Sequence, residues 1–159
     1  MDWLGIINFL ASAATAIGVL MAWQQVKLAR RLAKTQFEDE LAKQFRDIIW
    51  HIPVEALMGQ QLSEEKYQSA RDDFFRYVDL SNEQVFLRRH NRVSEETWWL
   101  WCEGMKAFLS RPAFRKAWEE FKAQAPDIFK ELRRLEEQNF ACDPREWGPA
   151  VAAGRRPKK

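Results

Sequence analysis

Arg46 and His51 are the two side chains whose types and spacing could carry out catalysis. They flank four residues in the segment Arg46-Asp-Ile-Ile-Trp-His51, which an apolar pattern of helical period places on a helix. Histidine can transfer a proton near neutral pH, and arginine can stabilise the charge that develops on a phosphate in a transition state. The pair would therefore suit acid–base chemistry at a phosphate group. The alternative is that both side chains lie at a solvent-exposed helix end and have no catalytic role.

The other chemically active residue types argue against a metal or a cofactor. The 159 residues include two histidines and two cysteines, Cys102 and Cys142, too few for the usual zinc spacings. The sequence has neither a phosphate-binding glycine loop nor a nucleophile elbow. Cys102 lies among tryptophans and leucine, so we expect a buried thiol without a chemical role. We expect no metal and no cofactor, and the sequence favours a protein that is not an enzyme.

A second group of basic residues lies at Arg88-Arg-His-Asn-Arg92. Arg88, Arg89, His90 and Arg92 could bind an anionic ligand, either a lipid headgroup or RNA. The alternative is structural, because the group follows a predicted helix, where cations offset the helix dipole. The net charge of the chain is only +2, which gives no strong case for a nucleic-acid partner.

The N-terminal segment has the length and composition of a transmembrane helix. The run from Trp3 to Trp23 has 21 residues, both tryptophans included, without a charge, about 30 Å of helix, which matches a bilayer core. A signal peptide would need a positively charged start, which Met1-Asp2 does not supply. Four basic residues follow the run, so the positive-inside rule places the C-terminal domain in the cytoplasm and the N-terminus outside. These residues are Lys27, Arg30, Arg31 and Lys34. The sequence therefore predicts a single-pass membrane protein.

Two faces of this segment could mediate assembly in the lipid bilayer. Ala14, Gly18 and Ala22 recur every four residues and form a stripe of small residues that lets another helix approach closely. Polar groups in hydrocarbon prefer a partner, so the polar residues on a second face would contact neighbouring copies or line an aqueous pore. The alternative is that a lone anchor tolerates both sets. We expect a homo-oligomer. The polar positions are Asn8, Ser12 and Thr15.

The rest of the chain predicts helices and no strands. One helix should continue from the apolar run to about His51, where Pro53 stops it, and further helices should occupy 63–89, 94–109, 110–125 and 127–139. The first three of these further helices should begin with serine N-caps, at Ser63, Ser94 and Ser110. The predicted fold is all-α, with a transmembrane anchor (1–24) continuing into a cytoplasmic bundle of about four to five helices (25–140) and an irregular basic tail (141–159). Because Trp98, Trp99 and Trp101 cannot share one helix face, at least one should meet lipid, another subunit or a ligand, unless all lie in a thick aromatic core.

A set of spaced residues in the second half of the chain resembles a known group of proteins. The set comprises Tyr77-Val-Asp-Leu-Ser-Asn-Glu-Gln-Val-Phe-Leu-Arg88, Arg92-Val-Ser-Glu-Glu-Thr-Trp98, Trp101, Gly104, Pro112-Ala-Phe114 and Trp118. It resembles the pattern of small bacterial membrane proteins that have one N-terminal span and a helical cytoplasmic domain. With the span included, the resemblance covers most of residues 1–140. It implies the fold, the topology and a place in the inner membrane of a bacterium rather than an activity.

The layout is also similar to the small membrane accessory protein of type VI-B CRISPR systems, and the Arg46–His51 spacing resembles the R-x(4–6)-H motif of HEPN-type helical ribonucleases. The first resemblance implies an oligomer around a pore, with Asn8, Ser12 and Thr15 facing it and Arg46 and His51 as a remnant motif. It also implies membrane depolarisation in antiviral defence, with a soluble effector protein as partner. We therefore expect a self-assembling, pore-forming or scaffolding accessory protein. A membrane-tethered HEPN-like ribonuclease acting on RNA and a monomeric membrane adaptor for a soluble protein are the alternatives.

Overall fold

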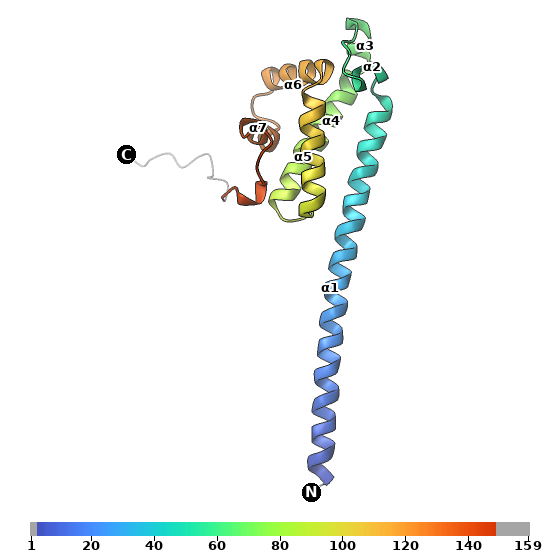
Figure 1. Cartoon of the computed structure of the whole chain (residues 1–159), viewed down its shortest axis with the longest axis vertical. Helices are drawn as coiled ribbons and strands as arrows, with labels where there is room; N and C mark the ends of the chain where they lie inside the picture. The colour runs from blue at the N-terminus through green and yellow to red at the C-terminus, as the bar shows by residue number, and fades with distance from the viewer. Residues whose placement is uncertain (1–2, 149–159) are drawn as a thin grey trace, which may run out of the picture. The chain divides into compact units, whose positions relative to one another are not determined.

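The computed structural model describes residues 3–148, apart from the side chains of residues 4–14. Within this range the chain forms α-helices and one 3₁₀ helix, with no β-strand, so the predicted all-α class is confirmed (Figure 1). The chain divides into two units, Met1–Asp39 and Glu40–Lys159. The elements are α1 (Trp3–His51), α2 (Val54–Leu57), α3 (Glu64–Ser69), α4 (Arg71–Arg89), α5 (Glu95–Leu109), α6 (Pro112–Gln124), α7 (Lys130–Glu137) and η1 (Pro144–Glu146).

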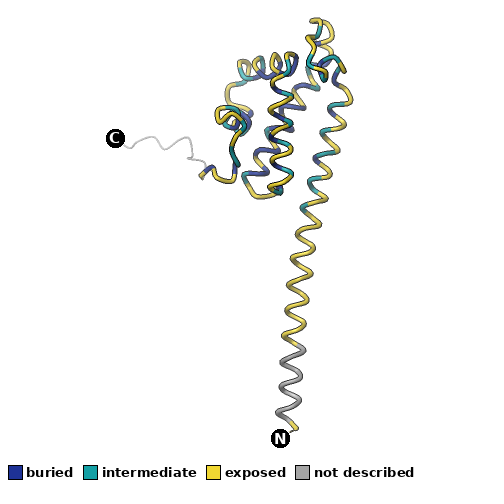
Figure 2. The backbone as a smooth tube through the Cα atoms, in the orientation of Figure 1, coloured by how far each residue is buried: buried dark blue, intermediate teal, exposed yellow. Residues whose placement is uncertain are grey.

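The described residues of the first unit, 3–39, all belong to helix α1, whose last residues lie in the second unit, and residues 15–33 of this helix are exposed (Figure 2). α1 ends at His51, as the sequence predicts, because Pro53 lacks a backbone N–H and disfavours helical dihedrals in the residue before it. Among the residues that the structure describes, no helix combines the length and the apolar character that crossing a membrane requires.

Local signals define the starts of two helices in the second unit. The side-chain oxygens of Ser63 and Ser94 accept hydrogen bonds from backbone N–H groups of the first turns of α3 and α5, at 3.4 and 3.3 Å. Acidic residues occupy both first turns, where they interact favourably with the helix dipole. Both N-caps were expected from the sequence.

Three predicted helix boundaries were wrong. The helix expected over 63–89 is broken at Ala70, whose φ of −97° and ψ of 4° are not helical, so α3 and α4 are separate. Helix α6 begins with Arg111 rather than Ser110 as its N-cap residue. Helix α7 begins three residues later than expected because Phe129 takes a left-handed conformation with φ 56°. Phe129 is nevertheless buried, and its ring lies 5.4 Å from that of Phe75, so packing offsets the backbone strain.

Aromatic side chains form much of the core of the second unit. The buried residues of its helices are dark blue in Figure 2. The ring of Phe114 in α6 lies 5.0 Å from those of both Phe74 and Tyr77 in α4. Phe108 of α5 lies 5.6 Å from Tyr77. Ring pairs at these separations stabilise beyond the area that they bury, so they hold α4, α5 and α6 together.

Candidate functional site

Within one chain, Arg46 and His51 lie on different sides of α1. Residues five positions apart on a helix are rotated by about 140°. Both residues are exposed, but the side chain of Arg46 lines a cavity that His51 does not line. His51 Nδ1 donates a hydrogen bond to the backbone carbonyl of Asp47 at 2.7 Å. The remnant catalytic pair therefore stays a prediction, and its two side chains would have to meet through a second copy.

Two of the predicted anion-binding side chains are already paired with carboxylates. Arg88 is fully buried, and its Nε and Nη2 donate to the two carboxylate oxygens of Asp143. Arg89 Nη1 lies 2.8 Å from Glu131 Oε1. His90 is exposed, and its Nδ1 donates to a backbone carbonyl of α4 at 2.8 Å. The sequence showed the basic group but not the acidic partners, which are 55 and 42 residues away.

Asp143 connects the predicted tail to the helical core. Burial alone would raise the pKa of its carboxyl group, but hydrogen bonds from the Arg88 guanidinium and from a backbone N–H outweigh that effect, so the pKa is lowered. Trp147 is also buried, and its Nε1 donates to Gln138 Oε1 at 2.9 Å. Residues 143–147 are therefore part of the compact unit. Arg92, the fourth predicted anion-binding residue, is exposed in the loop after α4.

The three neighbouring tryptophans have different environments, as their spacing required. Trp98 is completely buried, Trp99 is exposed, and Trp101 is half-buried and lines the same cavity as Arg46. Cys102 is a buried free thiol, as expected, and burial raises its pKa to about 12.

The cavity has a volume of about 330 Å³ and lies in the second unit, between the C-terminal part of α1, α4 and α5. This volume is within the range of small-molecule pockets. Most of the lining is apolar, and this part includes Phe45, Leu100, Trp101, Met105 and Phe108.

One wall of the cavity is polar although it is buried. Tyr77, Ser81 and Gln84 follow i, i+4, i+7 spacing on α4 and line the cavity, and each is at most 5% exposed. Ser81 Oγ donates to the backbone carbonyl of Tyr77 at 2.8 Å. Tyr77 Oη has no hydrogen-bond partner within the described part of the chain. Burial raises the pKa of Tyr77, so its hydroxyl keeps its proton and can donate at neutral pH.

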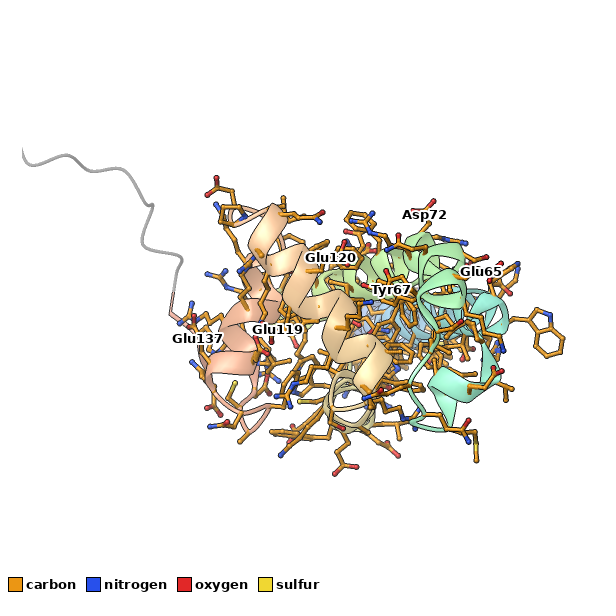
Figure 3. The ribbon with its side chains drawn as sticks, turned by 90° about the horizontal axis from the view of Figure 1, so that it is seen from above. Glu65, Tyr67, Asp72, Glu119, Glu120 and Glu137 are labelled. Atoms are coloured by element: carbon orange, nitrogen blue, oxygen red, sulfur yellow. The ribbon has the colours of Figure 1, made fainter. Side chains whose placement is uncertain are left out.

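Tyr67, the other tyrosine of the chain, has a partner. Its Oη donates to Glu120 Oε2 at 2.7 Å, and Glu120 also pairs with Arg71 at 2.7 Å (Figure 3). The hydrogen bond from Tyr67 is the main cause of the lowered pKa of Glu120. This group of side chains joins α3, α4 and α6 and has a structural role. Glu65, Asp72, Glu119 and Glu137, which are also labelled in Figure 3, are exposed carboxylates.

The sequence did not lead us to predict the polar cavity wall, although two of its residues could have indicated it. Ser81 and Gln84 are polar residues on the buried face of α4, where Arg88 is the other buried residue that is charged or polar and most inward positions are apolar, and such residues require a partner. The described residues contain no group of histidine, cysteine and acidic side chains arranged to hold a metal ion. The arrangement is suited to binding a small molecule. Comparisons of the chain with protein-family models, with curated proteins and with solved structures found no match.

Proposed function

We propose that this chain is a membrane-anchored helical protein that self-associates through its N-terminal helix and carries a binding unit on the cytoplasmic side. The observation that carries the proposal is the run from Trp3 to Trp23, which has 21 uncharged residues with a tryptophan at each end. Its length matches a bilayer core. Helix α1 extends through this run without a break. The side chains of residues 4–14, about half of the run, lie outside the described residues.

The segment after the run supports the same interpretation. Lys27 Nζ lies 5.2 Å from the centre of the Trp23 ring, one turn away on α1. An aromatic ring followed by basic side chains is typical of the membrane–water interface on the cytoplasmic side. Arg30, Arg31 and Lys34 extend the basic segment along the helix, where they would interact with anionic lipid headgroups.

The stripe of small residues supports self-association. Gly18 and Ala22 are exposed, and a Cβ atom placed on Gly18 would meet nothing within 4 Å. This face of α1 is therefore open to a second helix, which small residues allow to approach closely. Ala14, the third member of the stripe, has a side chain outside the described residues.

A pore is the more specific form of this proposal. It is supported by the resemblance to the type VI-B accessory protein and by the polar face of Asn8, Ser12 and Thr15. Thr15 is exposed, whereas the side chains of Asn8 and Ser12 lie outside the described residues. A pore in the inner membrane would depolarise the cell, which is the antiviral role that the resemblance implies. Conductance of the reconstituted oligomer in planar bilayers tests it, and a discrete oligomer that does not conduct would leave a scaffolding role.

The mass of the full-length chain in mild detergent tests self-association. The double variant Ala14→Leu/Gly18→Leu places bulk on the stripe, whereas Ala13→Leu/Ala16→Leu places similar bulk on the opposite side of the helix. We expect a discrete oligomer for the unchanged chain and for the control variant, and a monomer for the stripe variant. A monomeric unchanged chain would contradict self-association and favour the adaptor, for which exposed Trp99 is the candidate contact. Release of the chain from membranes by alkaline carbonate would contradict the anchor itself.

A further inference from the structure

We propose that the cavity between α1, α4 and α5 binds an apolar monocarboxylic acid. The carboxylate accepts a hydrogen bond from Tyr77 Oη, Arg46 is its counter-ion, and the apolar body packs against the aromatic wall. The volume of about 330 Å³ corresponds to about eleven non-hydrogen atoms, at the roughly 30 Å³ that a water molecule occupies in the liquid.

The buried hydroxyl of Tyr77 indicates that the ligand carries a hydrogen-bond acceptor. Tyr77 is 2% exposed, and its Oη lacks a partner among the described residues. A buried polar atom without a partner is costly and rare in native proteins. Because the hydroxyl keeps its proton, it offers a donor to the ligand. Gln84 lines the same cavity, and its side-chain amide can supply a second donor.

The charge of the lining indicates that this acceptor is an anion. Of the side chains that the structure describes around the cavity, that of Arg46 carries a charge and the others do not. Its guanidinium forms no ion pair within the described part of the chain. A carboxylate in an apolar cavity needs a counter-ion. Arg46, Tyr77 and Gln84 line the same cavity, and the proposal places the carboxylate among them.

The remaining lining determines the body of the ligand. Phe45, Trp101 and Phe108 supply aromatic surface, and Leu100 and Met105 supply aliphatic surface. Leu100 is 70% exposed, so the ligand would also cover apolar surface that is otherwise in contact with water. The body is therefore an alkyl chain or an aromatic ring without further charge.

A larger side chain substituted at Gly104 of α5 can fill the cavity. It lines the cavity, and a Cβ atom placed on it would meet nothing within 4 Å. A leucine at this position can therefore extend into the space that the ligand occupies, without a clash at its first atom.

Titration calorimetry of the full chain in lipid nanodiscs, with empty nanodiscs as the blank, tests the proposal. The probes are decanoate and 3-phenylpropionate, an aliphatic and an aromatic acid of matching size. We expect at least one of them to bind saturably with one site per chain. The acid with the higher affinity shows whether the apolar part of the ligand is aliphatic or aromatic. 1-Decanol, which has the same chain length as decanoate without the charge, should bind more weakly than decanoate.

Substitutions in the lining test whether the acid binds in this cavity. Tyr77→Phe should weaken binding by about tenfold or more, the value of a hydrogen bond to a charged group. Arg46→Gln should weaken it by up to about fivefold, because this side chain is exposed. Lys43→Gln, an exposed charge on the same helix that does not line the cavity, should leave the affinity unchanged. Gly104→Leu should abolish binding while the circular dichroism spectrum stays native.

Three results would overturn the proposal: heats no larger than those of empty nanodiscs for both acids, equal affinity in Tyr77→Phe, or equal affinity in Gly104→Leu. The last two would place any bound acid in the lipid or elsewhere on the chain.

Discussion

Replacing Tyr77 with phenylalanine should stabilise the ligand-free chain, whereas the same replacement at Tyr67 should destabilise it. Both side chains are almost completely buried in the second unit, at 2% and 1% exposure. Both variants lose one hydroxyl group and keep the ring. The difference lies in the partner, because Tyr67 Oη donates to Glu120 at 2.7 Å and Tyr77 Oη has no partner among the described residues.

The two expected changes have opposite signs. A hydrogen bond to a charged group contributes about 1.5–3 kcal/mol, and because the side chain of Glu120 is 25% exposed, Tyr67→Phe should cost about 1.5 kcal/mol. An unsatisfied buried hydroxyl costs about 1–3 kcal/mol, so Tyr77→Phe should raise the free energy of unfolding by about 1 kcal/mol. The variants should therefore differ by about 2.5 kcal/mol, several times the uncertainty of a typical comparison of mutants.

Urea unfolding of the full chain in mild detergent, followed by circular dichroism, measures both changes. Equal dependence of the free energy on urea concentration in all three proteins would show that the compactness of the states is unchanged. A loss of more than about 1 kcal/mol in Tyr77→Phe would refute the reasoning, because it would mean that ordered water already satisfies the hydroxyl. With saturating decanoate the advantage of Tyr77→Phe should shrink or reverse, because ligand stabilises the unchanged chain more.

Two further substitutions, the pH dependence of one of them and an RNA-cleavage assay also have definite expected outcomes. Gly104→Ala should raise the free energy of unfolding in urea by about 0.5–1 kcal/mol, because a mid-helix glycine is replaced with no clash at its Cβ; a loss would mean that the cavity wall cannot accept a methyl group. Asp143→Asn should cost about 3 kcal/mol in the same assay, because it leaves the Arg88 guanidinium buried without a counter-ion. Since folding lowers the pKa of Asp143 from 3.8, its stabilisation is present above that pH and lost as the pH falls further, so thermal melts at pH 5 and pH 3 should differ more for the unchanged chain than for the variant. The purified full chain should not cleave RNA; cleavage that His51→Ala abolishes would instead establish the ribonuclease alternative.

Several features were predictable because they depend on residues close together in the chain. Pro53 ends α1 through its own missing N–H, and Ser63 and Ser94 cap helices whose first turns contain the groups that they bind. The break at Ala70 and the left-handed Phe129 were not predictable in this way. Neither residue is a helix breaker by type. Ala70 is buried, and the Phe129 ring packs against Phe75 of α4 and Trp118 of α6.

The candidate site was predicted only in part, for the same reason. Arg46 was identified from its spacing to His51, but the structure places it beside Tyr77 and Trp101, which lie 31 and 55 positions further along the sequence. The basic group at Arg88 was visible in the sequence, whereas its partner Asp143 lay in a segment predicted to be irregular.

The sequence by itself determined the all-α class, the apolar N-terminal run with its basic flank, and the helix caps, because periodicity, charge and capping act within a few residues. Only the tertiary structure decided which arginines pair with carboxylates, which tryptophan lines a cavity and which tyrosine lacks a partner. Those properties depend on the burial of one side chain by others from distant segments. Helical period can show that a residue faces inward, but not what it meets there.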